Sequence, residues 1–156
     1  MFQIKDGIYS HRFSGNAMDA LGNPHCLVGI GYMKIVKAGK KLVIAGLQQT
    51  SLLRLKGSGG EAMAAQFLLD GVVDQPAGEV LFYADITFTQ TGTPAPSDPQ
   101  VMQDRFAMTP AGGADHFWLI STKPKLISGP GVTAAEAVWG EAVRMDDALA
   151  AEFTLR

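Results

Sequence analysis

The sequence predicts an all-β fold, in which an antiparallel meander of eight or nine strands closes into a small barrel. The first observation is the segment 80–90, where every second residue is apolar and of a type common in strands: Val80, Phe82, Ala84, Ile86 and Phe88. The second is the close spacing of turns rich in glycine, proline and aspartate. The third is strand length, because long consecutive hairpins leave exposed edges until the sheet closes. A β-sandwich is the alternative architecture.

Composition limits the classes of protein to which the chain can belong. The 156 residues have the size of one domain, 1–156, and can bury a core without disulfides. The net charge of −2 argues against a nucleic-acid surface, which needs concentrated Lys and Arg. No apolar run approaches the roughly 20 residues of a membrane helix, and no signal-peptide pattern opens the chain. We therefore expect a soluble, cytoplasmic protein without nucleic-acid or membrane partners.

The first half of the chain divides into five expected strands. Each is rich in β-branched, aromatic or other apolar residues and is bounded by residues that favour turns. The second strand contains Gly29 and Gly31, and glycine at alternate strand positions indicates a bend or the close approach of another group. The five segments are residues 7–18, 25–36, 42–55, 61–73 and 80–90.

The second half is less regular. Residues 91–103 include three prolines and predict a long irregular loop. Short strands are expected at 105–108 and 116–122, with a turn over 109–115 between them. Thr133 and Glu136 fit a helix capping box, whereas the alternation over 137–145 is typical of a strand, so we favour a strand over 137–145 and expect at most one short helix near 133–139. Residues 149–155 alternate as a last strand.

Pairing across the glycine-rich turn 56–60 predicts which side chains face the barrel interior. A symmetric pairing around this turn places Gln49 opposite Phe67 and Leu47 opposite Leu69, which aligns the apolar residues of the two strands. Ser51 shares the face of Gln49. We therefore expect these five side chains inside.

The next hairpin extends this interior face to the segment 80–90. A loop with an even number of residues after Val73 puts Phe82 and Ile86 on the same face as Phe67. Asp85 then points outward, which is also favourable because an unpaired carboxylate is costly to bury.

Four polar side chains are the candidates for a binding site inside this barrel. Tyr9 and His11 share a face with Phe13 on the first strand, and Gln49 and Ser51 belong to the third. Apolar walls with a few polar groups are the usual surroundings of a small ligand. The sequence thus predicts a site for an apolar or amphipathic small molecule, formed by Tyr9, His11, Gln49, Ser51, Phe67, Phe82 and Ile86. The alternative is that these polar groups satisfy one another without a ligand.

Two other functions stay open. The barrel could shape a substrate as a cyclase or isomerase does, although no nucleophile elbow identifies catalytic residues. It could instead be an oligomeric structural or interaction module with a filled core, and a homo-oligomer agrees with a second strand that is apolar on both faces. No cofactor is expected. A metal site has no support, because the histidines lack ligand spacing and Cys26 is the only cysteine.

The opening Gly7-x-Tyr9-x-x-x-Phe13-x-Gly15, followed by Val28-Gly-Ile-Gly31 and closely spaced hairpins, resembles uncharacterised bacterial β-barrel proteins. The resemblance covers about the first two-thirds of the chain. It implies an architecture similar to the calycin-like barrels of the lipocalins and to the allene oxide cyclases. No functional motif accompanies it, so it implies a fold and not an activity.

Overall fold

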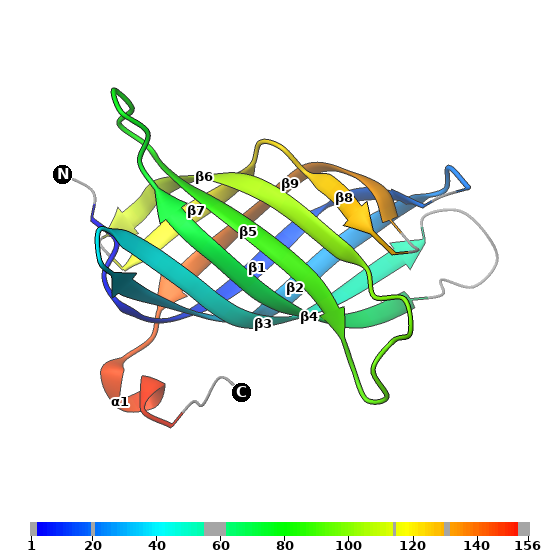
Figure 1. Cartoon of the computed structure of the whole chain (residues 1–156), viewed down its shortest axis with the longest axis horizontal. Coiled ribbons are helices and arrows are strands. Elements are labelled where there is room, and N and C mark those ends of the chain that lie inside the picture. The colour runs from blue at the N-terminus through cyan, green and yellow to red at the C-terminus, as the bar shows by residue number, and fades with distance from the viewer. Residues whose placement is uncertain (1–2, 20, 55–61, 114, 130–131, 153–156) are drawn as a thin grey trace.

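The computed structural model describes residues 3–19, 21–54, 62–113, 115–129 and 132–152, and it confirms the all-β fold (Figure 1). In this part of the chain, nine strands are followed by one short helix. They are β1 (Gly7–Asp19), β2 (Pro24–Ala38), β3 (Lys41–Arg54), β4 (Ala62–Asp74), β5 (Phe82–Thr91), β6 (Val101–Gly113), β7 (His116–Ser121), β8 (Lys125–Ser128), β9 (Val132–Arg144) and α1 (Asp147–Ala150).

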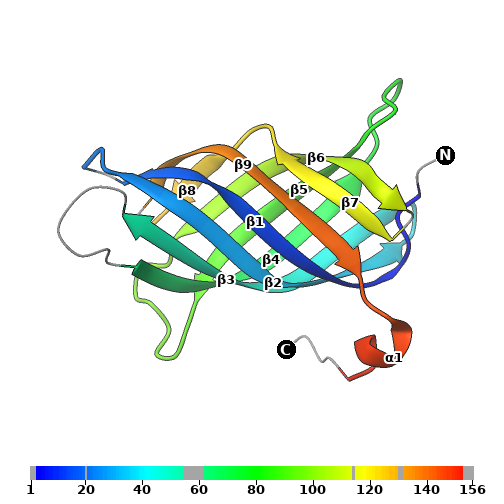
Figure 2. The same cartoon turned by 180° about the vertical axis from the view of Figure 1, so that it is seen from behind.

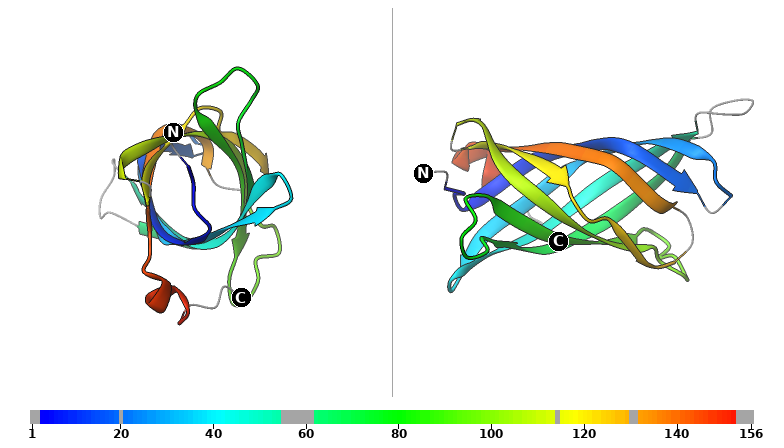
Figure 3. Two further views of the ribbon diagram at one scale, coloured as in Figure 1. Left: turned by 90° about the vertical axis from the view of Figure 1, so that its left-hand side faces the viewer. Right: turned by 90° about the horizontal axis from the view of Figure 1, so that it is seen from above.

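Eight of the strands close into an antiparallel barrel, as predicted. Hydrogen-bonded neighbours follow the order β5-β4-β3-β2-β1-β9-β7-β6, and β5 pairs with β6 to complete the ring. The ring is seen end-on in Figure 3 (left), and Figure 2 shows the wall that is hidden in Figure 1. The ninth strand, β8, pairs with the first residues of β6, whereas β7 pairs with the rest of β6. The helix α1 lies outside the barrel wall (Figures 1 and 3).

The glycines of β2 let two strands approach each other closely. A Cβ atom at Gly31 would lie 1.9 Å from the carbonyl oxygen of Leu47, and one at Gly29 would lie 2.5 Å from Nε2 of Gln48. This confirms the close approach expected from the sequence, and the group that approaches Gly29 is the Gln48 side chain.

The strand β6 is longer than predicted. The loop expected over 91–103 ends before Val101, and the turn expected over 109–115 is largely part of the strand. Pro110 is accommodated because the pairing with β7 shifts register between Pro110 and Gly113, where a missing N–H group is tolerated. The strand β8 was not predicted.

The C-terminal predictions are confirmed in one place and corrected in another. Residues 132–144 form a strand throughout, so the strand expected over 137–145 is confirmed and the short helix allowed near 133–139 does not form: pairing of β9 along β1, from Asp19 to Tyr9, overrides the local capping signal. The last strand expected over 149–155 is wrong for residues 149–152, which are the part of it that the structure describes. Asp146 instead accepts a hydrogen bond from the backbone nitrogen of Ala148 at 2.8 Å and starts α1. Residues 153–156 lie outside the described residues.

The predicted register of β3 against β4 is wrong by one residue. Phe67 lies opposite Gln48, not Gln49, and the turn 56–60 that set the prediction lies outside the described residues. This shift of one residue exchanges the inner and outer faces of β3. Leu47 is 41% exposed, whereas Gln48 and Thr50 are buried. Both alternating sets of β3 contain leucines, so the apolar pattern specified its register only weakly.

The face predictions for β4 and β5 are confirmed. Phe67, Leu69 and Ile86 are buried, and Val73 lies opposite Ala84, as an even-numbered loop requires. Asp85 points outward and pairs with Arg105 at 2.6 Å between Oδ2 and Nη1.

The outer face of β2 is unusually apolar. Val28 is 45% and Ile30 is 59% exposed. The homo-oligomer that such a face allows stays a prediction.

Large side chains fill one end of the barrel. Buried residues from seven strands pack there: Tyr9, Met33, Ile35, Ile44, Val73, Ala84, Met108, Phe117 and Leu119. At the opposite end, β1, β3 and β5 finish and β2, β4 and β6 begin. Side chains do not fill this end completely.

Candidate functional site

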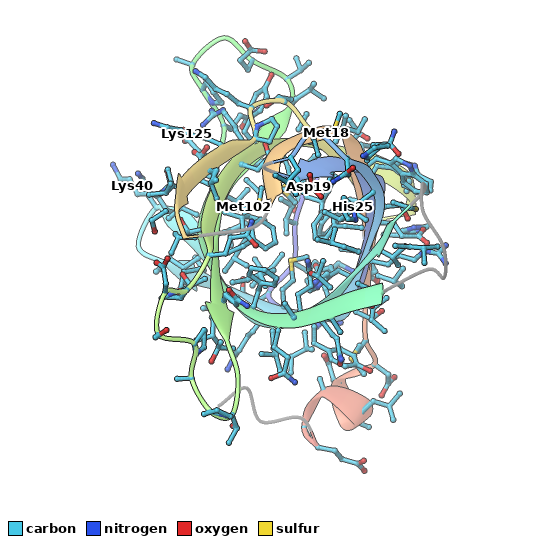
Figure 4. The ribbon with its side chains drawn as sticks, turned by 90° about the vertical axis from the view of Figure 1, so that its right-hand side faces the viewer. Met18, Asp19, His25, Lys40, Met102 and Lys125 are labelled. Atoms are coloured by element: carbon cyan, nitrogen blue, oxygen red, sulfur yellow. The ribbon has the colours of Figure 1, made fainter. Side chains whose placement is uncertain are left out.

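A cavity of about 480 Å³ occupies this second end of the barrel. Figure 4 looks into that end, with Met102 on the wall formed by β6 and His25 on the side formed by β2. Most of the lining is apolar: Phe13, Leu27, Leu52, Ala64, Ala65, Phe67, Phe88, Met102, Phe106, Pro124 and Val138.

Three aromatic rings form the floor of the cavity. The ring centroid of Phe13 lies 5.0 Å from that of Phe106 and 6.1 Å from that of Phe88. Phe13 and Phe106 also belong to the buried core, so they separate the cavity from the filled end. Edge-to-face and tilted contacts of this kind hold rings in fixed positions.

A hydrogen-bonded chain of three side chains runs from the barrel centre to the cavity wall. Nε2 of His11 lies 3.1 Å from Oε1 of Gln48, and Nε2 of Gln48 donates to Oγ1 of Thr50 at 2.8 Å. Gln48 and Thr50 line the cavity. The missing side chain at Gly29 makes room for the Gln48 amide.

The imidazole of His11 is neutral at pH 7. Burial lowers the pKa of His11 to about 4, although the hydrogen bond with Gln48 acts in the opposite direction. Its Nδ1 atom is buried and has no hydrogen-bond partner among the described residues. Protonation would therefore place an uncompensated charge inside the barrel.

Asp104 supplies a carboxyl group to the same cavity from the inner face of β6. It is only 8% exposed, and its Oδ1 accepts a hydrogen bond from the backbone nitrogen of Lys123 at 3.1 Å. Burial raises the pKa of Asp104, while hydrogen bonds from Ser121 and nearby backbone groups act against the increase.

Two hydrogen-bonded glutamines, Gln90 near the end of β5 and Gln100 just before β6, line the cavity. The backbone nitrogen of Gln100 donates to Oε1 of Gln90 at 3.0 Å, and the backbone nitrogen of Gln90 donates to the carbonyl oxygen of Gln100 at 2.8 Å. Both residues line the cavity, and Gln100 is buried. They add neutral donors and acceptors to its polar side.

At the rim, a hydrogen bond between His25 and Asp19 stabilises the hairpin between β1 and β2. Nε2 of the buried His25 lies 3.0 Å from Oδ2 of Asp19, and Oδ1 of Asp19 accepts hydrogen bonds from the backbone nitrogens of Leu21 and Asn23. The hydrogen bond with His25 is the main reason that the pKa of Asp19 lies well below its usual range. These contacts are local to the hairpin and its flanking strand, so we assign them a structural role.

The structure separates the residues predicted for the site. Phe67 lines the cavity, and His11 reaches it through Gln48. Tyr9, Phe82 and Ile86 are interior residues, but none of them lines the cavity. The hydroxyl of Tyr9 donates to the carbonyl oxygen of Lys5 at 2.7 Å, and burial raises the pKa of Tyr9 to about 12.

The interior positions predicted for Gln49 and Ser51 are wrong. Both are exposed on the outer face of β3, because the register differs by one residue. Gln48 and Thr50 take their places.

Asp104 was missed because it falls between the loop expected over 91–103 and the short strand expected over 105–108, and neither prediction included it. The alternation of Met102, Asp104, Phe106 and Met108 was the signal that could have placed it inside the barrel.

Comparisons with protein families, with curated proteins and with solved structures gave no match for this chain. Among the described residues, no helix has the length and apolar character needed to cross a membrane. In the same part of the chain, no group of three or more His, Cys, Asp or Glu side chains is arranged to hold a metal ion.

Proposed function

We propose that the protein binds an apolar or amphipathic small molecule in the cavity at the end of the barrel. The cavity volume of about 480 Å³ carries this proposal. Ligand sites typically measure about 300–1,000 Å³, whereas protein interiors otherwise leave few voids larger than a water molecule.

The distribution of polar groups supports an amphipathic ligand. Phe13, Phe67 and Phe88 offer an apolar surface, while Gln48 and Thr50 offer hydrogen bonds on one side. A few polar groups in an apolar cavity fix the orientation of a ligand. A filled structural core would leave no such space. The cyclase or isomerase alternative stays a prediction.

Filling the cavity tests the proposal. Ala65 lies opposite the buried Thr50 and lines the cavity, so Ala65→Trp would occupy the space of a ligand. Ala45 is exposed on the outer face of β3, and Ala45→Trp is the matched control. Leu52→Trp is a second filling variant.

Binding is measured by titration with the neutral, environment-sensitive dye Prodan. We expect a blue-shifted, saturable signal with the wild type and with Ala45→Trp, and at least tenfold weaker binding with either filling variant. Circular dichroism and thermal unfolding establish that the variants are folded. Equal binding by the wild type and both filling variants, or no binding by the wild type, would overturn the proposal.

A further inference from the structure

Asp104 is the one ionisable residue among the described residues that line the cavity. Among the described residues that line it, every polar residue other than Asp104 is a glutamine or a threonine. Asp104 lies between Met102 and Phe106 on the inner face of β6, and both of these neighbours also line the cavity. A carboxyl group in such surroundings loses most of its hydration.

Among the described residues, no cationic side chain is paired with this carboxylate. In the described part of the chain, no Lys, Arg or His nitrogen forms an ion pair with Asp104. Arg105 points outward to Asp85. Lys123 and Lys125 border the groove on the outer side of Asp104, where Lys123 contributes its backbone nitrogen to the carboxyl group.

The groups that donate hydrogen bonds to the Asp104 carboxyl are neutral. On β5 its partner is Ile86, and the carboxyl accepts hydrogen bonds from the side chain of Ser121, at the end of β7, and from backbone nitrogens on β6 and after β7. Burial outweighs these hydrogen bonds, as the direction of the change in the pKa of Asp104 shows. A cation placed in the cavity would therefore stabilise the carboxylate form.

We propose that Asp104 binds the protonated amino group of the ligand, so that the cavity selects lipophilic amines over alcohols and carboxylic acids. This inference rests on the proposed function of the cavity. The apolar part of the amine packs against Phe13, Phe67 and Phe88, and aromatic ring faces also attract cations. A carboxylate ligand would meet a like charge.

A purely structural role for Asp104 predicts something different. Its hydrogen bond from Lys123 holds the connection between β7 and β8, and this alone could account for the residue. Asparagine retains Oδ1 as an acceptor but has no charge. Asp104→Asn therefore preserves the structural contact and removes the group proposed to bind an amine.

The experiment compares octylamine, octanol and octanoate as competitors that displace Prodan at pH 7. These probes share one chain length, and the amine is protonated at this pH, as a lysine side chain is. For the wild type, we expect octylamine to bind at least tenfold more tightly than octanol, and octanoate to bind most weakly. In Asp104→Asn, octylamine should lose this advantage while octanol keeps its affinity.

Asp70→Asn is the matched control, because Asp70 is exposed on the outer face of β4. It should retain the wild-type preference. Equal affinities of octylamine and octanol for the wild type, or an undiminished preference in Asp104→Asn, would overturn the inference and leave the proposed function standing. Failure of all three probes and of Prodan itself would instead overturn the proposed function.

A measurement on the wild type keeps the inference testable if Asp104→Asn does not fold. Lowering the pH protonates Asp104, so the affinity for octylamine should fall while the affinity for octanol stays constant. Protonation of His11, whose pKa is about 4, would also repel an amine and not an alcohol, so the same pair of titrations on His11→Gln isolates the effect of Asp104. A constant ratio of the two affinities from pH 7 to pH 4 would overturn the inference.

Discussion

The buried imidazole of His11 predicts how the free energy of unfolding depends on pH. The folded protein holds this pKa at about 4, whereas an unperturbed histidine titrates near 6.5. As the pH falls below 6.5, the unfolded chain takes up a proton that the folded barrel does not. The stability contributed by the neutral ring is therefore complete above pH 6.5 and is lost as the pH falls towards 4.

The magnitude follows from the difference between the two pKa values. Each pKa unit corresponds to about 1.4 kcal/mol, so the wild type should lose about 3 kcal/mol between pH 7 and pH 4 because of His11. His11 is only 4% exposed, and solvent therefore screens little of this effect. A loss of this size is a large part of the stability of a single domain.

Urea unfolding of the wild type and of His11→Gln at several pH values isolates this contribution. Other titrating groups, including Asp19 and Asp104, act on both proteins and cancel in the difference. From pH 7 to pH 4, we expect the unfolding free energy of the wild type to fall by about 3 kcal/mol more than that of His11→Gln. A difference that stays constant with pH would refute the assignment of a neutral, buried His11.

Three further perturbations test other parts of the structure. Gly31→Ala should prevent stable folding, because its Cβ would lie 1.9 Å from the Leu47 carbonyl oxygen, whereas Gly113→Ala has open space and should change the melting temperature little. Urea unfolding of the wild type and of Asp104→Asn should show a pH dependence of the unfolding free energy opposite to that of the wild type and His11→Gln. The raised pKa of Asp104 means that the wild type gains stability relative to the variant as the pH falls from 7 towards the unperturbed value of 3.8. Phe13→Ala should lower the unfolding free energy by about 3–5 kcal/mol, and a loss below about 1 kcal/mol would contradict its place at the cavity floor.

The sequence correctly predicted which side of a strand faces the barrel interior where only one of the two sets of alternate residues was apolar. In β5, Ile86 and its apolar neighbours contrast with Asp85 and Thr87, and that contrast predicted which side lies inside. In β3, Leu47 and Leu52 belong to opposite sets, so either face could be buried. A slip of one residue was therefore enough to exchange Gln48 for Gln49 as the interior amide.

Local signals also failed where long-range pairing competes with them. The capping signal at Thr133 and Glu136 starts no helix, since β9 pairs with β1 along this stretch. Asp146 shows the reverse case, in which a side-chain cap starts a helix where alternation predicted a strand.

The cavity itself had no signature in the sequence. Its volume depends on how side chains of eight strands share the interior, and periodicity reports which residues face inward but not the space they leave. Of the predicted polar group, only His11 keeps a connection to the cavity, through Gln48.

A crystal structure of the protein soaked with a bromine-substituted octanol tests the central claim most directly, because anomalous scattering locates the bromine atom. The proposal predicts a bromine peak inside the barrel end, enclosed by Phe13, Phe67 and Met102. Bromine found only on the outer strand faces, or a cavity filled by its own side chains, would contradict it.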